Sequence, residues 1–367
     1  MRQLSYPHCI ILLYTVISAT IFTKTEQYTP SNIFIGGLGY TGSRLASSIH
    51  DAYPNAKISG TVRSIERRDG LLHHSSRPSW LTGNVHVLDI DDNYLGLDTE
   101  GVRDLMEADT IIQTVAPIAD FDRDPLLEFH DKELLNSENT LQYVAYISST
   151  GVYGNHDGGW VSENDELLCT DAKSLARIRA EMEWGKIEQI PEDTKQSVPR
   201  VDCFRCGGIY GPGRGPLFSS LESLTDAIQR VDEDRDNITP IKYVNRILVD
   251  DICSAILSGM SGNRPFHSGG RAYNLVDDDP APRMAVVSEA RQILLETNNA
   301  VDDDDGVILP SSSSTASRNV RNRVSRGTGN KRCTNSQLKS DYGWTPIAPT
   351  FREGLRLLME HSKGTSS

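Results

Sequence analysis

The stretch Ile33-Phe-Ile-Gly-Gly-Leu-Gly-Tyr-Thr-Gly42 decides the fold of this chain. Apolar residues lead directly into Gly36, Gly39 and Gly42, and a helical run follows. In a strand-to-helix turn with this spacing, the first glycine permits a tight turn and the second lets the backbone approach a pyrophosphate. The third lets the helix pack on the strand. The N-terminus of this helix offers N–H groups and a favourable dipole to the pyrophosphate. The stretch therefore predicts a dinucleotide-binding turn in which Tyr40 and Thr41 open the helix.

The second expected strand carries information about the nucleotide. A site that prefers NAD usually has a carboxylate about 20 residues after the glycines, where it holds the ribose 2′-hydroxyl. No carboxylate occurs from Ala52 to Ile65, and the expected strand ends in Arg63 and Ser64. A guanidinium binds a 2′-phosphate through two hydrogen bonds, whereas a carboxylate repels it. The sequence therefore favours NADP over NAD as the cofactor, with Arg63 and Ser64 at the ribose.

Short apolar runs alternate with helical stretches along the first half of the chain. This alternation is typical of right-handed βαβ units and predicts an α/β fold with a doubly wound parallel sheet. We expect a nucleotide-binding domain over residues 32–206 and a smaller, interleaved lobe for the substrate over residues 207–367, of which 241–276 return to the first domain. The expected strands are Asn32–Ile35, Lys57–Val62, Val85–Leu88, Thr110–Val115, Tyr143–Ser148 and Val201–Cys206.

Composition excludes several classes of protein. The 367 residues are 38% hydrophobic and 24% charged, values typical of a globular protein rather than of a disordered or multi-span membrane protein. The net charge of −13 argues against general binding to nucleic acid, because phosphates are held by clustered lysines and arginines. We expect a small-molecule substrate, no nucleic-acid partner and no stable membrane span after N-terminal processing.

Residues 1–31 are interpreted as a targeting segment. Arg2 precedes the apolar run Cys9–Phe22, which is shorter than the ~20 residues of a spanning helix and suits the core of a signal peptide. Polar, hydroxyl-rich residues follow it. The pattern favours an organelle, with the plastid preferred; the secretory route and the cytoplasm are the alternatives.

Several later motifs point to a family. Ile147-Ser-Ser-Thr-Gly-Val-Tyr-Gly154 covers the end of an expected strand, Val249-Asp-Asp251 lies in a run that mixes apolar residues with two acids, and Tyr342-Gly-Trp-Thr-Pro346 lies near the C-terminus. With the glycine turn, these motifs resemble the extended short-chain dehydrogenase/reductases, also described as NAD-dependent epimerases/dehydratases, over about Asn32–Met359. The resemblance implies an NAD(P)-binding Rossmann domain.

The resemblance also implies roles for individual residues. Ser149 falls where the family has its catalytic serine. Cofactor contacts are implied after the third expected strand, from Asp89 and Ile90, and after the fourth, from Val115, Ala116 and Pro117. Some members of the family dimerise, which makes a homodimer possible here.

One departure from the family pattern bears on catalysis. Ordinary members carry Tyr-x-x-x-Lys on the helix after the serine, where the tyrosine transfers a proton and the lysine lowers its pKa. Counting back from Glu181 puts Lys173 in the place of the tyrosine and Arg177 in the place of the lysine. The tyrosine is therefore missing from its usual position.

Three functions fit this pattern. In the first, the chain is an NAD(P)-dependent oxidoreductase or epimerase in which Tyr153 supplies the proton and Arg177 or Lys173 supplies the positive field; Tyr153 as a packed structural aromatic is the alternative. In the second, the chain binds NADP without turnover, as a sensor or regulatory module. In the third, it is an epimerase or dehydratase of nucleotide sugars, whose diphosphate could meet the basic stretch Arg318–Arg332.

No metal site is predicted. His73 and His74 have no spaced cysteine or acid to complete one, and Cys203-Phe-Arg-Cys206 lies in an apolar run expected to be a buried strand. The segment Asp302–Lys331, with its acidic run, serines and arginines, is expected to be a solvated loop.

Overall fold

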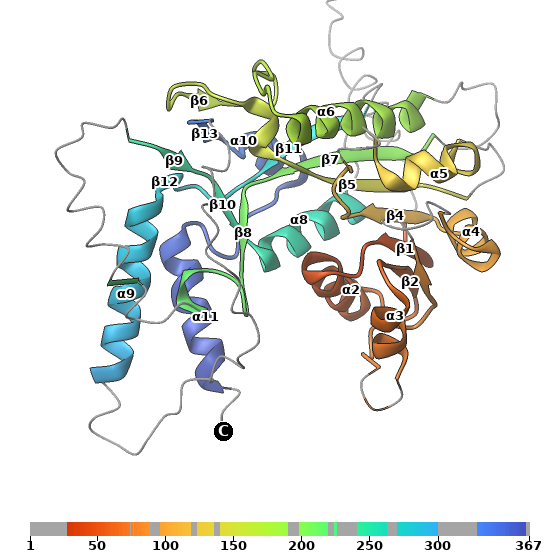
Figure 1. The fold of residues 1–367 in the computed structure, drawn as a ribbon, viewed down its shortest axis with the longest axis horizontal. Helices are drawn as coiled ribbons and strands as arrows, with labels where there is room; N and C mark the ends of the chain where they lie inside the picture. Colours follow the sequence, from red (N-terminus) through yellow and green to blue (C-terminus); the bar gives the residue numbers. More distant parts are fainter. Residues whose placement is uncertain are drawn as a thin grey trace, which may run out of the picture.

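A computed structural model describes residues 28–73, 75, 77–88, 96–118, 123–135, 140–189, 198–218, 224–225, 241–262, 270–299 and 329–364. Its centre is a seven-stranded sheet with the order β11-β7-β5-β4-β1-β2-β3, in which every neighbouring pair is parallel (Figure 1). The strands are β1 Asn32–Gly36, β2 Lys57–Val62, β3 Val85–Val87, β4 Thr110–Gln113, β5 Tyr143–Ser149, β7 Arg200–Cys206 and β11 Arg271–Leu275. The predicted doubly wound α/β fold is confirmed.

Helices cover both faces of this sheet, as Figure 1 shows. One face carries α2 (Tyr40–Ala52), α3 (Ile65–Leu72) and α8 (Val249–Ser261), whose apolar residues join a core with β1 and β2. The other face carries α4 (Thr99–Met106), α5 (Pro125–Leu134) and α6 (Ala172–Gly185), which pack around Phe34, Tyr146 and Trp184. Because both faces are covered, the strands are buried along most of their length, which explains why apolar residues occur on both of their faces instead of alternating with exposed polar ones.

A smaller lobe is built from residues after β7 (left in Figure 1). Its core joins Tyr210, Leu248 and Ala281 with the apolar faces of two helices, α9 and α11. The chain returns from it to the main sheet through α8 and β11, which pairs with β7. The elements outside the main sheet are β8 Gly208–Tyr210, η3 Pro216–Phe218, β9 Tyr243–Val244, β10 Arg246–Leu248, β12 Ala281–Pro282, α9 Arg283–Asn299, β13 Arg332–Cys333, α10 Ser336–Tyr342 and α11 Phe351–Gly364.

The first described residues, before β1, contact the start of β4. The Tyr28 hydroxyl donates to the Asp109 carboxylate at 2.7 Å, and the backbone N–H of Ser31 donates to the same side chain at 2.7 Å. Residues 28–31, which the sequence analysis assigned to the leader, therefore contact the folded domain. Residues 1–27, and with them the predicted apolar core of the targeting segment, lie outside the described residues.

None of the helices in the described part of the chain combines the length and the apolar character needed to cross a membrane.

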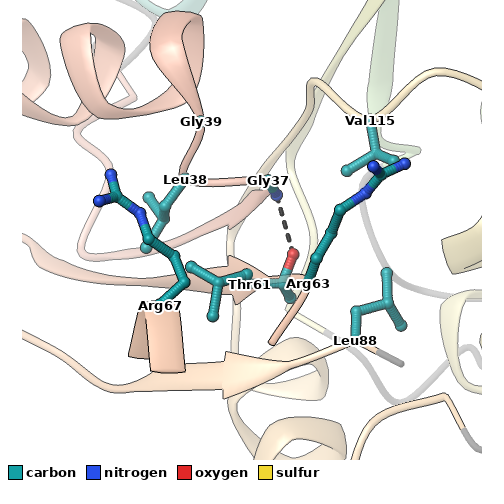
Figure 2. Close-up of a pocket in the computed structure, with 9 residues that line it drawn as sticks. Gly37, Leu38, Gly39, Thr61, Arg63, Arg67, Leu88 and Val115 are labelled. Carbon is teal, nitrogen blue, oxygen red and sulfur yellow. Dashed lines mark hydrogen bonds between the residues drawn. The ribbon is translucent and has the colours of Figure 1, made fainter. Parts of the chain in front are cut away.

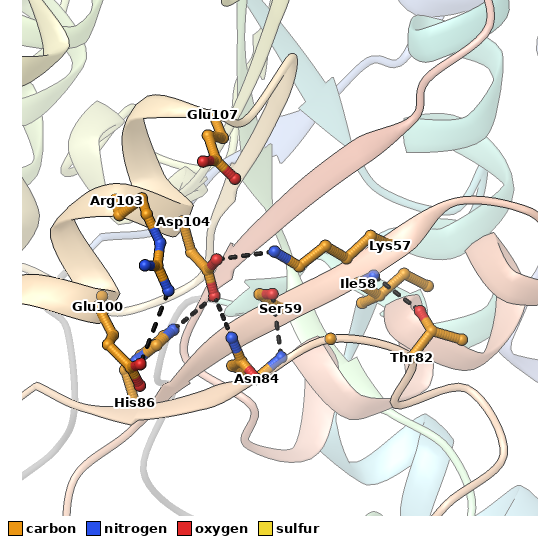
Figure 3. Close-up of polar contacts among 12 residues, drawn as sticks. Lys57, Ile58, Ser59, Thr82, Asn84, His86, Glu100, Arg103, Asp104 and Glu107 are labelled. Atoms are coloured by element: carbon orange, nitrogen blue, oxygen red, sulfur yellow. Dashed lines mark hydrogen bonds and ion pairs between the residues drawn. The ribbon is translucent and has the colours of Figure 1, made fainter.

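A polar cluster around the buried side chains of His86 and Asp104 joins β2, β3 and α4 at one edge of the sheet (Figure 3). Asp104 accepts hydrogen bonds from Lys57 at 2.7 Å and from Asn84 at 2.9 Å, and it lies 2.8 Å from the His86 ring. Burial by itself raises the pKa of Asp104, but the hydrogen bonds from Lys57, His86 and Asn84 outweigh it and lower the pKa to about 2.

Because of this cluster, we expect the free energy of unfolding to depend on pH in the acidic range. Because the pKa of Asp104 is lower in the folded than in the unfolded chain, its contribution is present above about pH 4 and is lost as the pH falls towards 2. We expect Asp104→Asn to lower the free energy of unfolding by roughly 2 kcal/mol at pH 7 and by much less at pH 2. Urea unfolding at pH 7, 4, 3 and 2 measures this. Glu107→Gln, an exposed residue that ends the same helix, is the control; an equal loss for Asp104→Asn at all four pH values would contradict the prediction.

Candidate active site

The three glycines of the predicted turn occupy three different environments. A methyl group added at Gly36 would lie 2.0 Å from the Gln113 side-chain oxygen, and one added at Gly42 would lie 2.0 Å from the Gly37 carbonyl oxygen. Gly42 therefore lets α2 pack against the turn. At Gly39 no protein atom lies within 4 Å of such a methyl group. The middle glycine thus faces open space next to the N-terminus of α2, which begins at Tyr40.

Hydrogen bonds from the neighbouring strands hold the turn. Gly37 has a φ of +91°, a conformation that favours glycine, and its N–H donates to the Thr61 hydroxyl at 2.8 Å. The Thr114 hydroxyl donates to the carbonyl oxygens of Gly36 and Gly37 at 2.9 and 2.8 Å. These threonines end β2 or follow β4, so their place in the turn became visible only when the strands were paired.

A pocket of about 190 Å³ lies between this turn and the end of β2 (Figure 2). In the figure Arg67 extends towards Leu38, and Arg63 extends towards Val115. Both arginines are exposed, and neither forms an ion pair with a carboxylate of the described residues. The residues that line the pocket are Gly37, Leu38, Gly39, Thr61, Val62, Arg63, Arg67, Leu88 and Val115. No carboxylate is among them.

The other predicted cofactor residues have varied positions. Ser64 caps α3 by accepting the Arg67 N–H at 3.3 Å, so it orients the helix rather than lining the pocket. Tyr40 and Thr41 lie in the first turn of α2. Val115 lines the pocket, while Ala116 and Pro117 follow it on the loop after β4. Asp89 and Ile90 lie outside the described residues.

Ser149 ends β5 at the carboxyl edge of the sheet. Its hydroxyl accepts the Gly151 N–H at 3.1 Å and so caps the short helix η1 (Thr150–Tyr153). A methyl group added at Gly151 would lie 3.3 Å from the Ser149 hydroxyl and 3.1 Å from the Ser174 hydroxyl. The structure therefore brings Ser149 close to the first turn of α6, where the family resemblance puts the proton-transfer chemistry.

Tyr153 belongs to a buried network. Its side chain is fully buried, and its hydroxyl donates to Asn274 at 2.8 Å and accepts from Arg205 at 2.9 Å. Arg205 in turn forms an ion pair of 2.7 Å with Glu181, which also accepts from the Ser148 hydroxyl at 2.5 Å. Burial raises the pKa of Tyr153 well above its usual range. These contacts do not support Tyr153 as a proton donor, because its proton is held inside the core; the packed aromatic is the better interpretation.

The two basic candidates on α6 are placed differently. Arg177 is half-buried and donates to the Lys173 carbonyl oxygen at 3.2 Å, within its own helix. Lys173 is exposed. The positive charge next to the Tyr153 hydroxyl belongs instead to Arg205, which donates to that hydroxyl at 2.9 Å and lies over the ring.

The smaller lobe holds a second cavity, of about 210 Å³. Arg246 lines it and donates to the carbonyl oxygens of Val244 and Ala281 at 2.9 Å each. Tyr210 also lines it, and its buried hydroxyl has no hydrogen-bond partner in the described part of the chain.

Comparison with solved structures identifies the architecture. A conserved protein of unknown function from Silicibacter pomeroyi DSS has 23% identity and a TM-score of 0.62, covering 90% of this chain and 99% of that one. The dTDP-glucose 4,6-dehydratase of Bacillus anthracis, solved with NAD, has 18% identity and a TM-score of 0.57, covering 92% of this chain and 97% of the dehydratase. This chain has the epimerase/dehydratase fold. The UDP-N-acetylglucosamine 4-epimerase of Bacillus cereus shares it, with 12% identity, a TM-score of 0.53, and coverage of 91% of this chain and 100% of the epimerase.

Comparison of the sequence with family models and with curated proteins gives no match. No protein-family model matches the chain, and no curated protein matches it significantly in sequence. The epimerase/dehydratase fold predicted from the motifs is thus confirmed by structure, at identities too low to transfer an activity.

The described residues include no group of three or more His, Cys, Asp or Glu side chains arranged to hold a metal ion. The basic stretch that was expected to meet a diphosphate lies mostly outside them. Its end is described, however, and there the expectation of a solvated loop is wrong. Lys331 is only 8% exposed, and Asn330 accepts the backbone N–H groups of His156 and Gly158 at 3.0 and 2.9 Å.

Proposed function

We propose that this protein is an NADP-dependent oxidoreductase or epimerase-like enzyme that acts on a small molecule. The observation that carries the proposal is the combination of an open space at Gly39 with a neighbouring pocket that contains two arginines and no carboxylate. The residues fit the cofactor, because a pyrophosphate needs close approach to the backbone and a 2′-phosphate needs a cation.

Each part of the site has a separate task. The backbone at Gly37–Gly39 and the N-terminus of α2 would bind the pyrophosphate, and Arg63 with Arg67 would hold the ribose 2′-phosphate. Bound NADP supplies hydride chemistry at its nicotinamide ring. At the carboxyl edge of the sheet, the Ser149 hydroxyl can donate a hydrogen bond to a substrate oxygen and so orient it.

Arg63→Ala tests the cofactor preference. We expect the Kd for NADPH to rise roughly 10- to 100-fold, the effect of losing one charge-assisted contact, while the Kd for NADH changes less than about threefold. Fluorescence titration of the purified protein at fixed low salt measures both constants. Arg68→Ala is the matched control, because Arg68 pairs with Asp69 at 3.0 Å and does not line the pocket. An equal loss for both cofactors, or tighter binding of NADH by the unmodified protein, would count against the NADP proposal.

A second candidate function has its own supporting observation. The hydroxyl of Tyr153 is held in the core and Lys173 stands where the family has its tyrosine, so proton transfer by a tyrosine has no support here. A chain that binds NADP without turnover, as a sensor, would have these features. We expect such a protein to bind NADPH but not to oxidise it in the presence of any compound from a panel of carbonyl compounds and nucleotide sugars. Hydrogen isotope exchange at a sugar carbon without net use of the cofactor would instead support an epimerase.

A further inference from the structure

The C-terminal segment that bears Lys331 is bound to the loop that follows Ser149. The N–H of Arg332 donates to the Gly159 carbonyl oxygen at 2.9 Å, and β13 pairs in parallel with β6 (Trp160–Val161). The Arg332 guanidinium lies over the rings of Trp160 and Tyr243, at 4.9 and 4.7 Å from their centroids. Residues 329–333 are therefore fixed in place by contacts on both sides of Lys331.

These contacts bring the Lys331 ammonium towards the Ser149 turn. A methyl group added at Gly329 would lie 2.1 Å from the Gly154 carbonyl oxygen and 3.1 Å from the Lys331 Nζ. The ammonium group thus lies close to Gly154, which directly follows η1, the helix that Ser149 caps. Gly154 in turn packs against Leu168 and Cys169, just before α6 begins.

The charged and titratable groups that act on Lys331 come from each of the neighbouring segments. They are Cys333 on β13, Cys169 and Asp171 before α6, and Lys242 before β9. Burial raises the pKa of both thiols, that of Cys333 to about 12, so neither thiol is a counterion. Asp171 is exposed and accepts the Ser174 N–H at 3.0 Å. Among the described residues, Lys331 forms no ion pair, and its side chain makes no hydrogen bond.

A buried lysine without a carboxylate partner is costly for the fold, because the charged form loses its hydration. Burial lowers the pKa of Lys331 below its usual value. Groups with such properties are concentrated in functional sites, where a lysine of lowered pKa gives up its proton more readily than an exposed lysine.

We propose that Lys331, beside the turn that Ser149 caps, is the acid–base group of this enzyme and takes the role of the missing tyrosine. This inference rests on the proposed NADP-dependent function. Bound NADPH would supply the hydride that reduces a ketone carbon and would itself be oxidised. Lys331 would give its proton to the ketone oxygen to complete the alcohol, and its neutral amine would take up a proton from solvent. Ser149 orients the same oxygen by a hydrogen bond.

Reductive methylation tests the state and the accessibility of Lys331 without any substrate. Formaldehyde with cyanoborohydride modifies only the neutral amine, and peptide mass spectrometry gives the rate at each lysine from pH 6 to 10. We expect the rate at Lys331 to reach half its maximum at a pH at least one unit below that of Lys186, an exposed residue after α6. We also expect NADP⁺ to slow the reaction at Lys331 at least fivefold and to leave Lys186 unaffected. A midpoint equal to that of Lys186, no modification at any pH, or no protection by NADP⁺ would overturn the proposal.

A stability measurement separates this role from a structural one. Lys331→Met keeps most of the alkyl chain and removes a buried charge, so we expect its urea midpoint to equal or exceed that of the unmodified protein. A clear loss of stability would show that the ammonium has a structural partner and would overturn the proposal. Fluorescence titration with NADPH on the same preparation separates failure of the proposed function from failure of this inference. No binding of NADPH refutes the proposed function. Normal binding of NADPH, together with a Lys331 that reacts with the same pH midpoint as Lys186, refutes only this inference.

Discussion

Gly39→Ala is expected to weaken NADPH binding at least about 100-fold, or by about 2.7 kcal/mol, while the protein stays folded. The reason lies in the environment of this glycine. No protein atom lies within 4 Å of the added methyl group, and the φ of −86° suits alanine. The methyl group would instead occupy the space through which a pyrophosphate approaches the backbone. Isothermal titration with NADPH measures the binding, and urea unfolding without ligand measures the stability.

Gly42→Ala provides the matched control, because it differs only in where the methyl group goes. At Gly42 the methyl group would lie 2.0 Å from the Gly37 carbonyl oxygen, which belongs to backbone and cannot move without opening the turn. We expect this variant to lose stability, whereas Gly39→Ala loses no more than about 1 kcal/mol as a weaker helix cap. NADPH binding by Gly39→Ala with an unchanged Kd would contradict the assignment of the pyrophosphate to this turn.

Arg205→Met is expected to lower the free energy of unfolding by about 3–5 kcal/mol, the usual result of breaking a buried ion pair. The side chains of Arg205 and Glu181 are 7% and 9% exposed, and their charged groups are 2.7 Å apart. Without the guanidinium, Glu181 keeps only neutral partners and the Tyr153 hydroxyl loses a donor. Urea unfolding at pH 7, followed by circular dichroism, measures the loss.

A double variant sharpens this second test. Arg205→Met combined with Glu181→Leu removes both charges, so it should be clearly more stable than Arg205→Met alone. Arg103→Ala is the surface control, because Arg103 and Glu100 are both largely exposed and 3.6 Å apart, and such pairs contribute about 0–1 kcal/mol. If the two single losses simply added in the double variant, the network would not be coupled as described.

The expected strands were confirmed closely because each of them carries a run of apolar residues that the covered sheet buries. Lys57–Val62 was predicted with both ends correct, and the others agree within two residues, as expected for ends set by individual hydrogen bonds. The seventh strand of the sheet, β11, was not among the expected strands. Its sequence, Arg-Ala-Tyr-Asn-Leu, is short and partly polar, and only its pairing with β7 makes it a strand.

Some residues of the candidate site could be predicted from the sequence and others could not. The glycine spacing and the arginine after β2 are local features, so they could be found without coordinates, and the structure places Arg63 and Gly39 around one pocket. Tyr153 could not be judged from the sequence, because its two hydrogen-bond partners, Arg205 and Asn274, are 52 and 121 residues away along the chain.

The sequence by itself determined the class of fold and the place of the glycine turn. Hydrophobic pattern and glycine spacing act over a few residues, where backbone geometry leaves few choices. Only the tertiary structure decided which side chains are buried, which are exposed and which lie near Ser149. In the structure Tyr153 is buried in the core and Lys173 is exposed. Lys331, from the C-terminal part of the chain, lies close to the turn that Ser149 caps. Burial and electrostatic partners are properties of contacts between distant residues, and no local pattern encodes them.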